Sequence, residues 1–281
     1  MSGVPVSTDN FCYRHPNRAS FVLCQRCGRT ICPECQVQAA VGVHCVECAR
    51  QNRAVRPKPR IVTALRSTSS VPVVTYSIIA VTAFFFVLQS LPVIGNQVTG
   101  ALQYAGVYTQ PLTGAPLEPW RMLSTVVMHG GILHLAFNMY VLFVFGRMLE
   151  QMLGRGRFLA LYLLAGLAGS VAVDYLASPF QGVVGASGAI FGLMGAFFVI
   201  QRRLGGNTTQ LLVLVGINLV IGFIPGTNVA WQAHVGGLVV GALVGLVFMA
   251  TRNVRQKGLQ IALLAAVGAG LIALTAVRAM F

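Results

Sequence analysis

Acidic residues are scarce in this sequence. Only 6 of its 281 residues are Asp or Glu, and charged residues of either sign make up 9% of the chain. Soluble globular domains carry about 25% charged residues, so the composition excludes an ordinary soluble domain and leaves little carboxylate chemistry. Hydrophobic residues account for 56% of the chain instead, which is typical of a polytopic membrane protein.

Cysteine is absent beyond residue 48, and the first residues lack an apolar segment. All seven cysteines lie between Cys12 and Cys48, mostly as Cys-x-x-Cys pairs near histidines. This pattern favours zinc binding in a reducing compartment over a disulfide framework. Because Met1–Asn10 has no apolar core, we expect neither a cleaved secretory signal nor an organelle presequence.

The basic residues are unevenly distributed. A net charge of +14 is compatible with nucleic-acid binding, but the 20 Lys and Arg residues cluster beside apolar segments. The positive-inside rule explains this distribution, so we expect a membrane partner and no nucleic acid. Residues 51–70 carry five basic residues and two prolines. They predict a basic juxtamembrane linker that lies against anionic headgroups.

Apolar segments recur after residue 70, and most have the length of a membrane helix, roughly 17–25 residues. They cover residues 71–93, 131–150, 157–177, 185–202, 210–225, 231–250 and 258–279. The fifth is short, and polar groups interrupt the second and fourth, so seven helices is the preferred count and not a fixed one. We predict an all-α polytopic membrane protein with a six-helix core at 71–250. A seventh transmembrane helix follows at 251–281, and a small zinc-stabilised domain precedes at 1–50.

The charge distribution also predicts the orientation. With the N-terminus in the cytoplasm, 18 of the 20 basic residues fall on the inner side, and only Arg121 and Arg278 fall outside. Reversing the orientation of the chain in the membrane, or removing one helix, destroys this bias. In this topology Ser187 and His234 both begin helices at the outer face, so they can meet at one depth.

Ser187 and His234 are the candidates for catalysis, because polar residues at bilayer depth mark function more often than packing. Serine becomes a nucleophile when a base removes its proton, and histidine is the usual base near neutral pH. No carboxylate is positioned to orient His234, so we expect a Ser–His dyad with the imidazole held by packing. Phe191, one turn after Ser187, is the candidate stacking ring. The structural alternatives are a core phenylalanine and a serine bonded to its own helix.

Two further features support a site between helices. Glycines spaced by three or four residues let helix backbones approach closely; they are Gly188, Gly192 and Gly195, and Gly237, Gly241 and Gly245. His134 and Asn138 are spaced i, i+4 and share a helix face. Both could donate to an oxyanion together with the backbone N–H of Ser187, or simply join helices by hydrogen bonds. His129 could shape the adjacent loop instead.

Four motifs, in this order, resemble those of the rhomboid intramembrane serine proteases over about residues 71–250. They are Trp120-Arg121, His134-x-x-x-Asn138, Gly185-Ala186-Ser187-Gly188 and Ala233-His234-x-x-Gly237-x-x-x-Gly241. The resemblance implies Ser187 as nucleophile, His234 as general base, and His134 and Asn138 as oxyanion donors, supported by Gly185 and Gly188. Phe191 stands where many members of the family have tyrosine, and we expect its ring to keep the stacking role.

The resemblance also implies what such a protein acts on and where. Substrates would be single-span membrane proteins with small or helix-breaking residues near the cut, cleaved near the outer face without a catalytic cofactor. The family occurs in bacterial inner membranes and in eukaryotic organelles, and the expected lack of a presequence favours a bacterial plasma membrane. A non-proteolytic binder or chaperone of client helices is the alternative, against which the intact Ser187 and His234 argue. A transporter would need inverted repeats and intramembrane charges along a path, and the sequence has no convincing repeat and too few charges.

The N-terminal region contains four candidate pairs of metal ligands. They are Cys12 and His15, Cys24 and Cys27, Cys32 and Cys35, and Cys45 and Cys48, with His44 as a substitute for Cys45. Eight ligands fit two tetrahedral zinc ions, and the spacing resembles a B-box-type zinc finger with interleaved pairs. A redox Cys-x-x-Cys site is the weaker alternative. Because about 40 residues bury too small a core, we expect two structural Zn²⁺ ions to stabilise this cytoplasmic unit. It could bind a protein partner, dimerise or regulate the rest of the chain.

Overall fold

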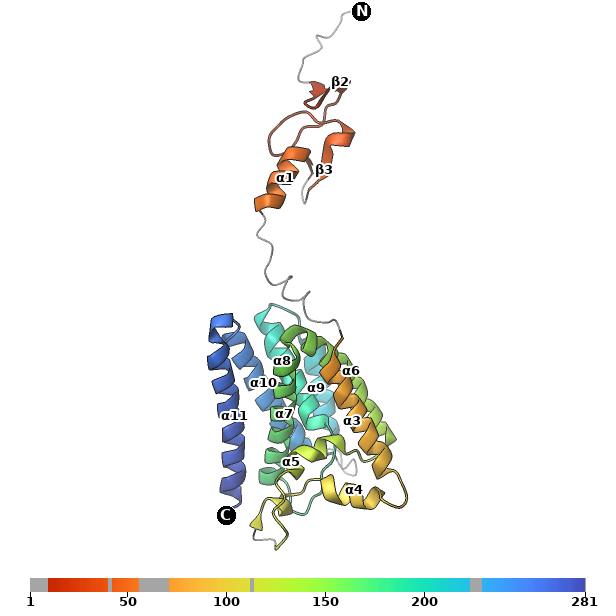
Figure 1. Cartoon of the computed structure of the whole chain (residues 1–281), viewed down its shortest axis with the longest axis vertical. Helices are drawn as coiled ribbons and strands as arrows, with labels where there is room; N and C mark the ends of the chain where they lie inside the picture. The colour runs from red at the N-terminus through yellow and green to blue at the C-terminus, as the bar shows by residue number, and fades with distance from the viewer. Residues whose placement is uncertain (1–9, 40–41, 56–70, 112–113, 223–228, 281) are drawn as a thin grey trace, which may run out of the picture. The chain divides into compact units, whose positions relative to one another are not determined.

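The computed structural model describes residues 10–39, 42–55, 71–111, 114–222 and 229–280, with the side chains of 52–55 left aside. The chain divides into two compact units, Met1–Ser67 and Thr68–Phe281, which are described separately. The basic linker predicted at 51–70 falls mostly outside the described residues. Figure 1 shows a small first unit with short strands and a second unit built of helices.

The first unit consists of two short hairpins and one helix. Strand β1 (Phe11–Cys12) pairs antiparallel with β2 (His15–Ala19), and β3 (Gln36–Gln38) pairs antiparallel with β4 (Val43–Cys45). A 3-10 turn, η2 (Pro33–Cys35), precedes β3, and helix α1 (Val46–Val55) follows β4. Among the described residues, the buried cluster of this unit holds six cysteines and one aliphatic side chain, Ile31. So small an apolar core cannot stabilise the unit by burial alone.

The second unit contains a helix in each of the seven predicted apolar segments. These helices are α3 (Val73–Gln89), α6 (Ile132–Leu153), α7 (Arg155–Leu176), α8 (Ser187–Arg203), α9 (Thr209–Ile221), α10 (Trp231–Ala250) and α11 (Lys257–Arg278). By length and apolar composition α6, α7, α10 and the stretch Val254–Arg278 can each cross a membrane, whereas α3 and α9 are shorter apolar helices. The prediction of a helical integral membrane protein is therefore confirmed, and the division into six helices plus one stays a prediction.

The long connection between α3 and α6 has its own short helices. These are α4 (Gly95–Leu102), η3 (Gly106–Tyr108), α5 (Arg121–Ser124) and η5 (Thr125–Val127), while η6 (Val254–Gln256) leads into α11. Arg121 holds this connection together: it pairs with Glu118, stacks over the ring of Tyr108 at 3.9 Å and donates to the carbonyl of Gln103 at 3.2 Å. The arginine of the Trp120-Arg121 motif thus ties α5 to the end of α4 and to the segment between them.

Helix α8 lies at the centre of the bundle and packs against α7 and α10 (Figure 1). Ten of its residues are buried, and most of them are small or aliphatic. By contrast, α3, α6, α9 and α11 expose many large apolar side chains, such as Phe137 and Ile217. Exposed apolar faces of this kind suit contact with lipid chains rather than water.

Glycines allow α8 and α10 to touch along their backbones. A Cβ added at Gly237 would overlap the carbonyl oxygen of Gly188, and one added at Gly241 would overlap the backbone of Gly192. One turn further along, a Cβ on Gly245 would lie 2.9 Å from the Cα of Ala196. The two predicted glycine stripes therefore face each other, and side chains larger than hydrogen do not fit between them.

Buried polar contacts tie segments that are distant in the sequence. Glu150 accepts from the backbone N–H groups of Val74 and Thr75, at 2.9 and 2.8 Å, and from the Thr75 hydroxyl at 2.8 Å. A carboxylate at this position satisfies free N–H groups at the start of α3 and complements the helix dipole. At the other end of α3, Gln89 exchanges hydrogen bonds with the backbone of His129. Both ends of α3 are thereby fixed to α6 and the segment before it.

Candidate active site and metal-binding groups

The predicted catalytic residues line one cavity of about 600 Å³ in the helical unit. Helix α6 contributes His134 and Asn138, α8 contributes Ser187 and Phe191, and α10 contributes His234. Gly185 and Gly188 line the same cavity. The fold therefore brings residues that are about a hundred positions apart to one cavity.

Ser187 is the first residue of α8. Its backbone N–H is one of those without a partner inside the helix. Gly185, two residues earlier, has φ +128°, a backbone conformation that L side chains rarely adopt. The N–H of Gly185 donates to the carbonyl of Thr125 at 3.1 Å, and the Thr125 hydroxyl donates to the carbonyl of Val183 at 2.6 Å. These bonds fix the segment that presents Ser187 to the cavity.

Thr125 and Tyr104 are site-supporting residues that the sequence reasoning missed. Val183 pairs with Tyr104 in an isolated antiparallel bridge, with N···O distances of 2.7 and 3.2 Å. The Tyr104 hydroxyl in turn contacts Thr109, which donates to buried Asp174 at 2.9 Å. Nothing local in the sequence links Thr125 to Val183 or Thr109 to Asp174, because these contacts span 58 and 65 positions.

His234 stacks on Phe191. Their ring centroids are 4.1 Å apart and the ring planes are inclined by 9°. The imidazole is buried, and its Nδ1 has no hydrogen-bond partner. Within the described part of the chain no hydrogen bond joins His234 to Ser187, an arrangement common in catalytic pairs without bound substrate. Packing, and not a carboxylate, sets the orientation of this ring.

His134 and Ser187 lie on either side of Gly185. The N–H of Gly130 donates to His134 Nδ1 at 3.3 Å, so a neutral ring carries its proton on Nε2. A Cβ built on Gly185 would lie 2.9 Å from that Nε2 and 3.7 Å from the Oγ of Ser187. The two groups thus border the same small space, which glycine at 185 keeps open.

Asn138 lines the cavity that contains Ser187, whereas His129 does not. Asn138 is buried in the cavity wall and donates one N–H to the carbonyl of His134 at 2.8 Å, which leaves its second N–H. His129 is buried beside His134, with ring centroids 5.0 Å apart, and neither of its ring nitrogens has a partner. It is absent from the cavity lining, and its backbone contacts with Gln89 fit a role in the loop.

The eight predicted metal ligands gather into two groups in the first unit. One group holds Cys12, His15, Cys32 and Cys35, and the other holds Cys24, Cys27, Cys45 and Cys48. In each group the candidate ligand atoms all lie within 4.8 Å of one another. Among the described residues Cys45, and not its neighbour His44, joins a group. The pairs interleave, because the first pair meets the third and the second meets the fourth.

The separations within both groups fit a tetrahedral ion. Zinc bonds to sulfur at about 2.3 Å and to histidine nitrogen at about 2.0 Å, which separates S and N by about 3.5 Å and two sulfurs by about 3.8 Å. His15 Nδ1 lies 3.8, 3.4 and 3.5 Å from the sulfurs of Cys12, Cys32 and Cys35. In the other group the sulfurs of Cys27 and Cys45 are 3.8 Å apart. These four separations are close to those around a tetrahedral Zn²⁺ ion.

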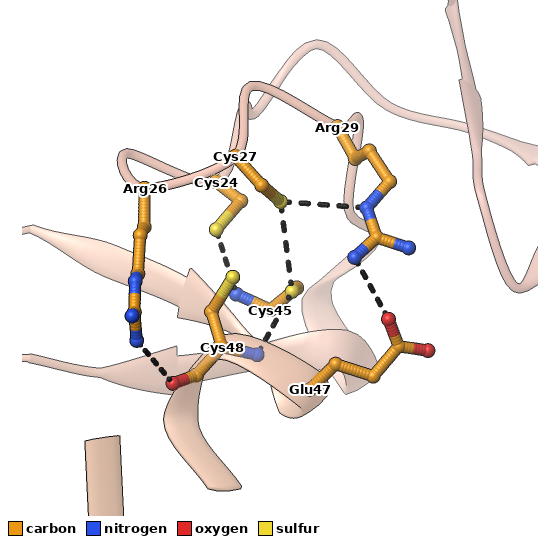
Figure 2. Close-up of polar contacts among 7 residues, drawn as sticks. All are labelled: Cys24, Arg26, Cys27, Arg29, Cys45, Glu47 and Cys48. Atoms are coloured by element: carbon orange, nitrogen blue, oxygen red, sulfur yellow. Dashed lines mark hydrogen bonds and ion pairs between the residues drawn. The ribbon is translucent and has the colours of Figure 1, made fainter. Parts of the chain in front are cut away.

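Charged neighbours support the second group, as Figure 2 shows. Arg29 Nε donates to the sulfur of Cys27 at 3.4 Å, and a terminal nitrogen of Arg29 pairs with Glu47 at 2.7 Å. Hydrogen bonds from the side chain and backbone of Arg29 lower the pKa of the Cys27 thiol to about 6. The thiolate is the form that binds metal, so Arg29 favours the ligand state of this exposed cysteine.

Comparisons with known proteins concern the helical unit and the residues just before it. Residues 116–251 match the model of the Rhomboid domain family. The rhomboid protease GluP of Bacillus subtilis is 39% identical over 175 residues, which are 60% of this chain and 34% of GluP. RHOMBOID-like protein 5 of Arabidopsis thaliana is 39% identical over 141 residues, 47% of this chain and 45% of the plant protein. This chain thus spans less than half the length of these two relatives.

A third relative is matched over most of its length. YdcA of Bacillus subtilis, whose assignment as a rhomboid protease is provisional, is 35% identical over 183 residues. These residues are 61% of this chain and 86% of YdcA. The family model covers all five predicted catalytic and supporting side chains, from His134 to His234, and does not reach the cysteine groups.

Proposed function

The chain belongs to the rhomboid family, and from this premise we propose that it is an intramembrane serine endopeptidase. The observation that carries the proposal is the single cavity lined by Ser187, His234, His134 and Asn138. A serine, a histidine and further hydrogen-bond donors around one space are the groups that acyl transfer requires. The alternative, a non-proteolytic binder of client helices, would have no use for this combination.

In the proposed reaction His234 removes the proton of Ser187 as its oxygen attacks the substrate carbonyl. The imidazolium then protonates the leaving amine, and an acyl-enzyme forms on Ser187. Water, activated by the same imidazole, hydrolyses the ester and regenerates the serine. Stacking on Phe191 at 4.1 Å keeps the ring in one plane through both steps, in place of the carboxylate that orients histidine in a triad.

The oxyanion of each tetrahedral intermediate needs donors that are already in place. The N–H of Ser187 at the start of α8, the Nε2–H of His134 and the second N–H of Asn138 are the proposed donors. The first is aided by the positive end of the helix dipole. The Gly130 bond to Nδ1 supports this role, because it leaves Nε2 as the donor of a neutral imidazole.

Substrates are proposed to be membrane proteins cut within or beside a transmembrane segment. A carbonyl in an intact helix is already bonded, so local unwinding must precede attack, and glycine or proline near the cut lowers that cost. We place the cut near the outer face of a bacterial plasma membrane and the N-terminus in the cytoplasm, because 18 of 20 basic residues then lie inside. No cofactor takes part in the proposed chemistry.

The cysteine-rich unit is proposed to hold two structural zinc ions, as in a B-box-type finger. The interleaved groups and their tetrahedral separations support this. Each ion would be bound by four protein ligands, which leaves no open position for catalysis. Zinc would replace the missing apolar core and make folding of the unit metal-dependent.

Cleavage of a model transmembrane substrate in proteoliposomes tests the proposed function. Wild-type protein should cut it, whereas Ser187→Ala and His234→Ala should each lose at least about 1,000-fold in rate. Correct folding of both variants is checked by thermal unfolding in detergent before they are reconstituted. Cleavage that survives Ser187→Ala would reject the nucleophile, and an inactive wild type that still binds the substrate helix would favour the chaperone alternative.

A further inference from the structure

The first unit exposes three consecutive apolar side chains. Phe21 is 82% exposed, Val22 39% and Leu23 54%. Phe21 and Leu23 line a surface hollow together with Tyr13 and Arg29. Exposed large apolar residues in a row differ from the scattered ones of ordinary surfaces and mark a contact site.

The backbone holds these side chains outward. Ile31 donates its N–H to the carbonyl of Val22 at 2.8 Å, and Cys24 donates to the carbonyl of Arg29 at 2.9 Å. The Ser20 hydroxyl donates to the carbonyl of Ile31 at 2.8 Å and accepts from the N–H of Val22 at 3.3 Å. Because both flanks are pinned beside the metal-binding groups, Phe21–Leu23 cannot turn into the core. Their exposure is a built feature of the unit.

The unit that carries this apolar tip has more basic than acidic side chains, although Arg18 pairs with Glu34 and Arg29 with Glu47. Among residues 10–51 the charged side chains are five arginines and two glutamates, all exposed; the arginines are Arg14, Arg18, Arg26, Arg29 and Arg50. Arg29 borders the same hollow as Phe21. Exposed apolar side chains on a basic unit suit the interface of an anionic bilayer, where the apolar groups enter the headgroup region and guanidinium groups meet phosphate.

We propose that Phe21–Leu23 dock into the surface of the anionic membrane in which the chain is anchored. Only residues 56–72 separate α1 from α3, a stretch that reaches no further than about 60 Å. Tethering supplies a high effective concentration of membrane, so three apolar side chains suffice. A stable protein interface covers about 800 Å² per side, and three side chains make up only a part of such an area. The proposal rests on membrane anchoring and is independent of proteolysis.

Fluorine NMR of the full chain in nanodiscs tests the docking. 4-(Trifluoromethyl)phenylalanine replaces Phe21, and in a matched control it replaces Gln38, an exposed residue of β3 in the same unit. In nanodiscs containing phosphatidylglycerol, doxyl-labelled lipid should erase most of the Phe21 signal, whereas an aqueous gadolinium chelate should leave it. The Gln38 label should respond in the opposite way. A zinc content of two per chain verifies that each labelled unit is folded.

The second part of the test measures how docking depends on the charge of the lipid and of the protein. In phosphatidylcholine nanodiscs, or after Arg14→Gln with Arg18→Gln, the loss caused by doxyl lipid should fall several-fold. The proposal is overturned if the Phe21 label behaves like the Gln38 label. It is equally overturned if Phe21 is shielded from both reagents, which would indicate a protein contact, or if removing charge leaves the doxyl effect unchanged.

Discussion

The ring of Phe191 stacks on the imidazole of His234, with centroids 4.1 Å apart and an interplanar angle of 9°. Both residues are buried, and they come from different helices, α8 and α10. Because His234 Nδ1 has no polar partner, this stack and the helix packing behind it orient the proposed base. The geometry of the proposed dyad therefore depends on how closely α8 and α10 approach.

Loss of the Phe191 ring should lower the rate of catalysis while the protein stays folded. Aromatic stacking contributes about 0.5–1.5 kcal/mol, so we expect Phe191→Leu to lower kcat by about 3- to 10-fold with little change in KM. Phe191→Tyr, which keeps the ring, should stay near wild type. Phe248→Leu serves as the control, because Phe248 is a buried phenylalanine of α10 that lies outside the cavity. Equal kcat losses in Phe191→Leu and Phe248→Leu would contradict a specific role for the stack.

Substitution of Gly241 should separate α8 from α10. A methyl group there would overlap the backbone of Gly192, and overpacking typically costs about 1–3 kcal/mol. We expect Gly241→Ala to lower the free energy of unfolding in SDS titrations by about 2–3 kcal/mol and to abolish cleavage. Gly270→Ala, on an exposed face of α11 with no atom within 4 Å, should leave both unchanged. An active, stable Gly241→Ala protein would show that backbone contact is not required.

Glu150 should stabilise the start of α3. Hydrogen bonds to a charged group contribute about 1.5–3 kcal/mol, and Glu150 accepts three. We expect Glu150→Gln to destabilise the protein by about 2 kcal/mol and to speed amide hydrogen exchange at Val74 and Thr75. Thr75→Val removes only one of the three bonds and should cost about half as much. If Glu150→Gln costs no more than Thr75→Val, the carboxylate is not acting as a cap.

Zinc counting on the full chain distinguishes interleaved from sequential ligand pairs. Cys12 and Cys32 lie in one group and Cys24 in the other. Cys12→Ser with Cys32→Ser should therefore leave one zinc per chain, whereas Cys12→Ser with Cys24→Ser should leave none. Sequential pairing predicts the reverse result. Cys45→Ser should leave one zinc and the neighbouring control His44→Ala two, as measured by plasma mass spectrometry on fresh protein.

Sequence patterns predicted the parts of this molecule that depend on local composition. Each apolar segment contains a helix, and the polar residues Ser187 and His234 stood out because their surroundings are apolar. Glycine spacing indicated where α8 and α10 approach, because such stripes have one helical period. The order of the cysteine pairs came from the resemblance to a known finger, since spacing alone allows other pairings.

Contacts between distant segments could not be predicted in the same way. Glu150 meets the start of α3 some 75 positions earlier in the chain, and nothing near either residue marks the pair. Asp174 is not spaced along its helix in a way that relates it to the site residues. Its contact with Thr109, 65 positions earlier, appears only in three dimensions. Such hydrogen bonds follow from the packing of the helix bundle, so they can be identified only once the three-dimensional structure is known.

Covalent labelling of Ser187 tests the central claim most directly. A fluorophosphonate should phosphonylate the wild-type protein at Ser187, and peptide mass spectrometry should locate the adduct on that residue. His234→Ala should lower the labelling rate by at least about 100-fold, because the base would be gone. Wild-type rates of adduct formation in His234→Ala, or an adduct on another serine, would contradict a serine activated by this histidine.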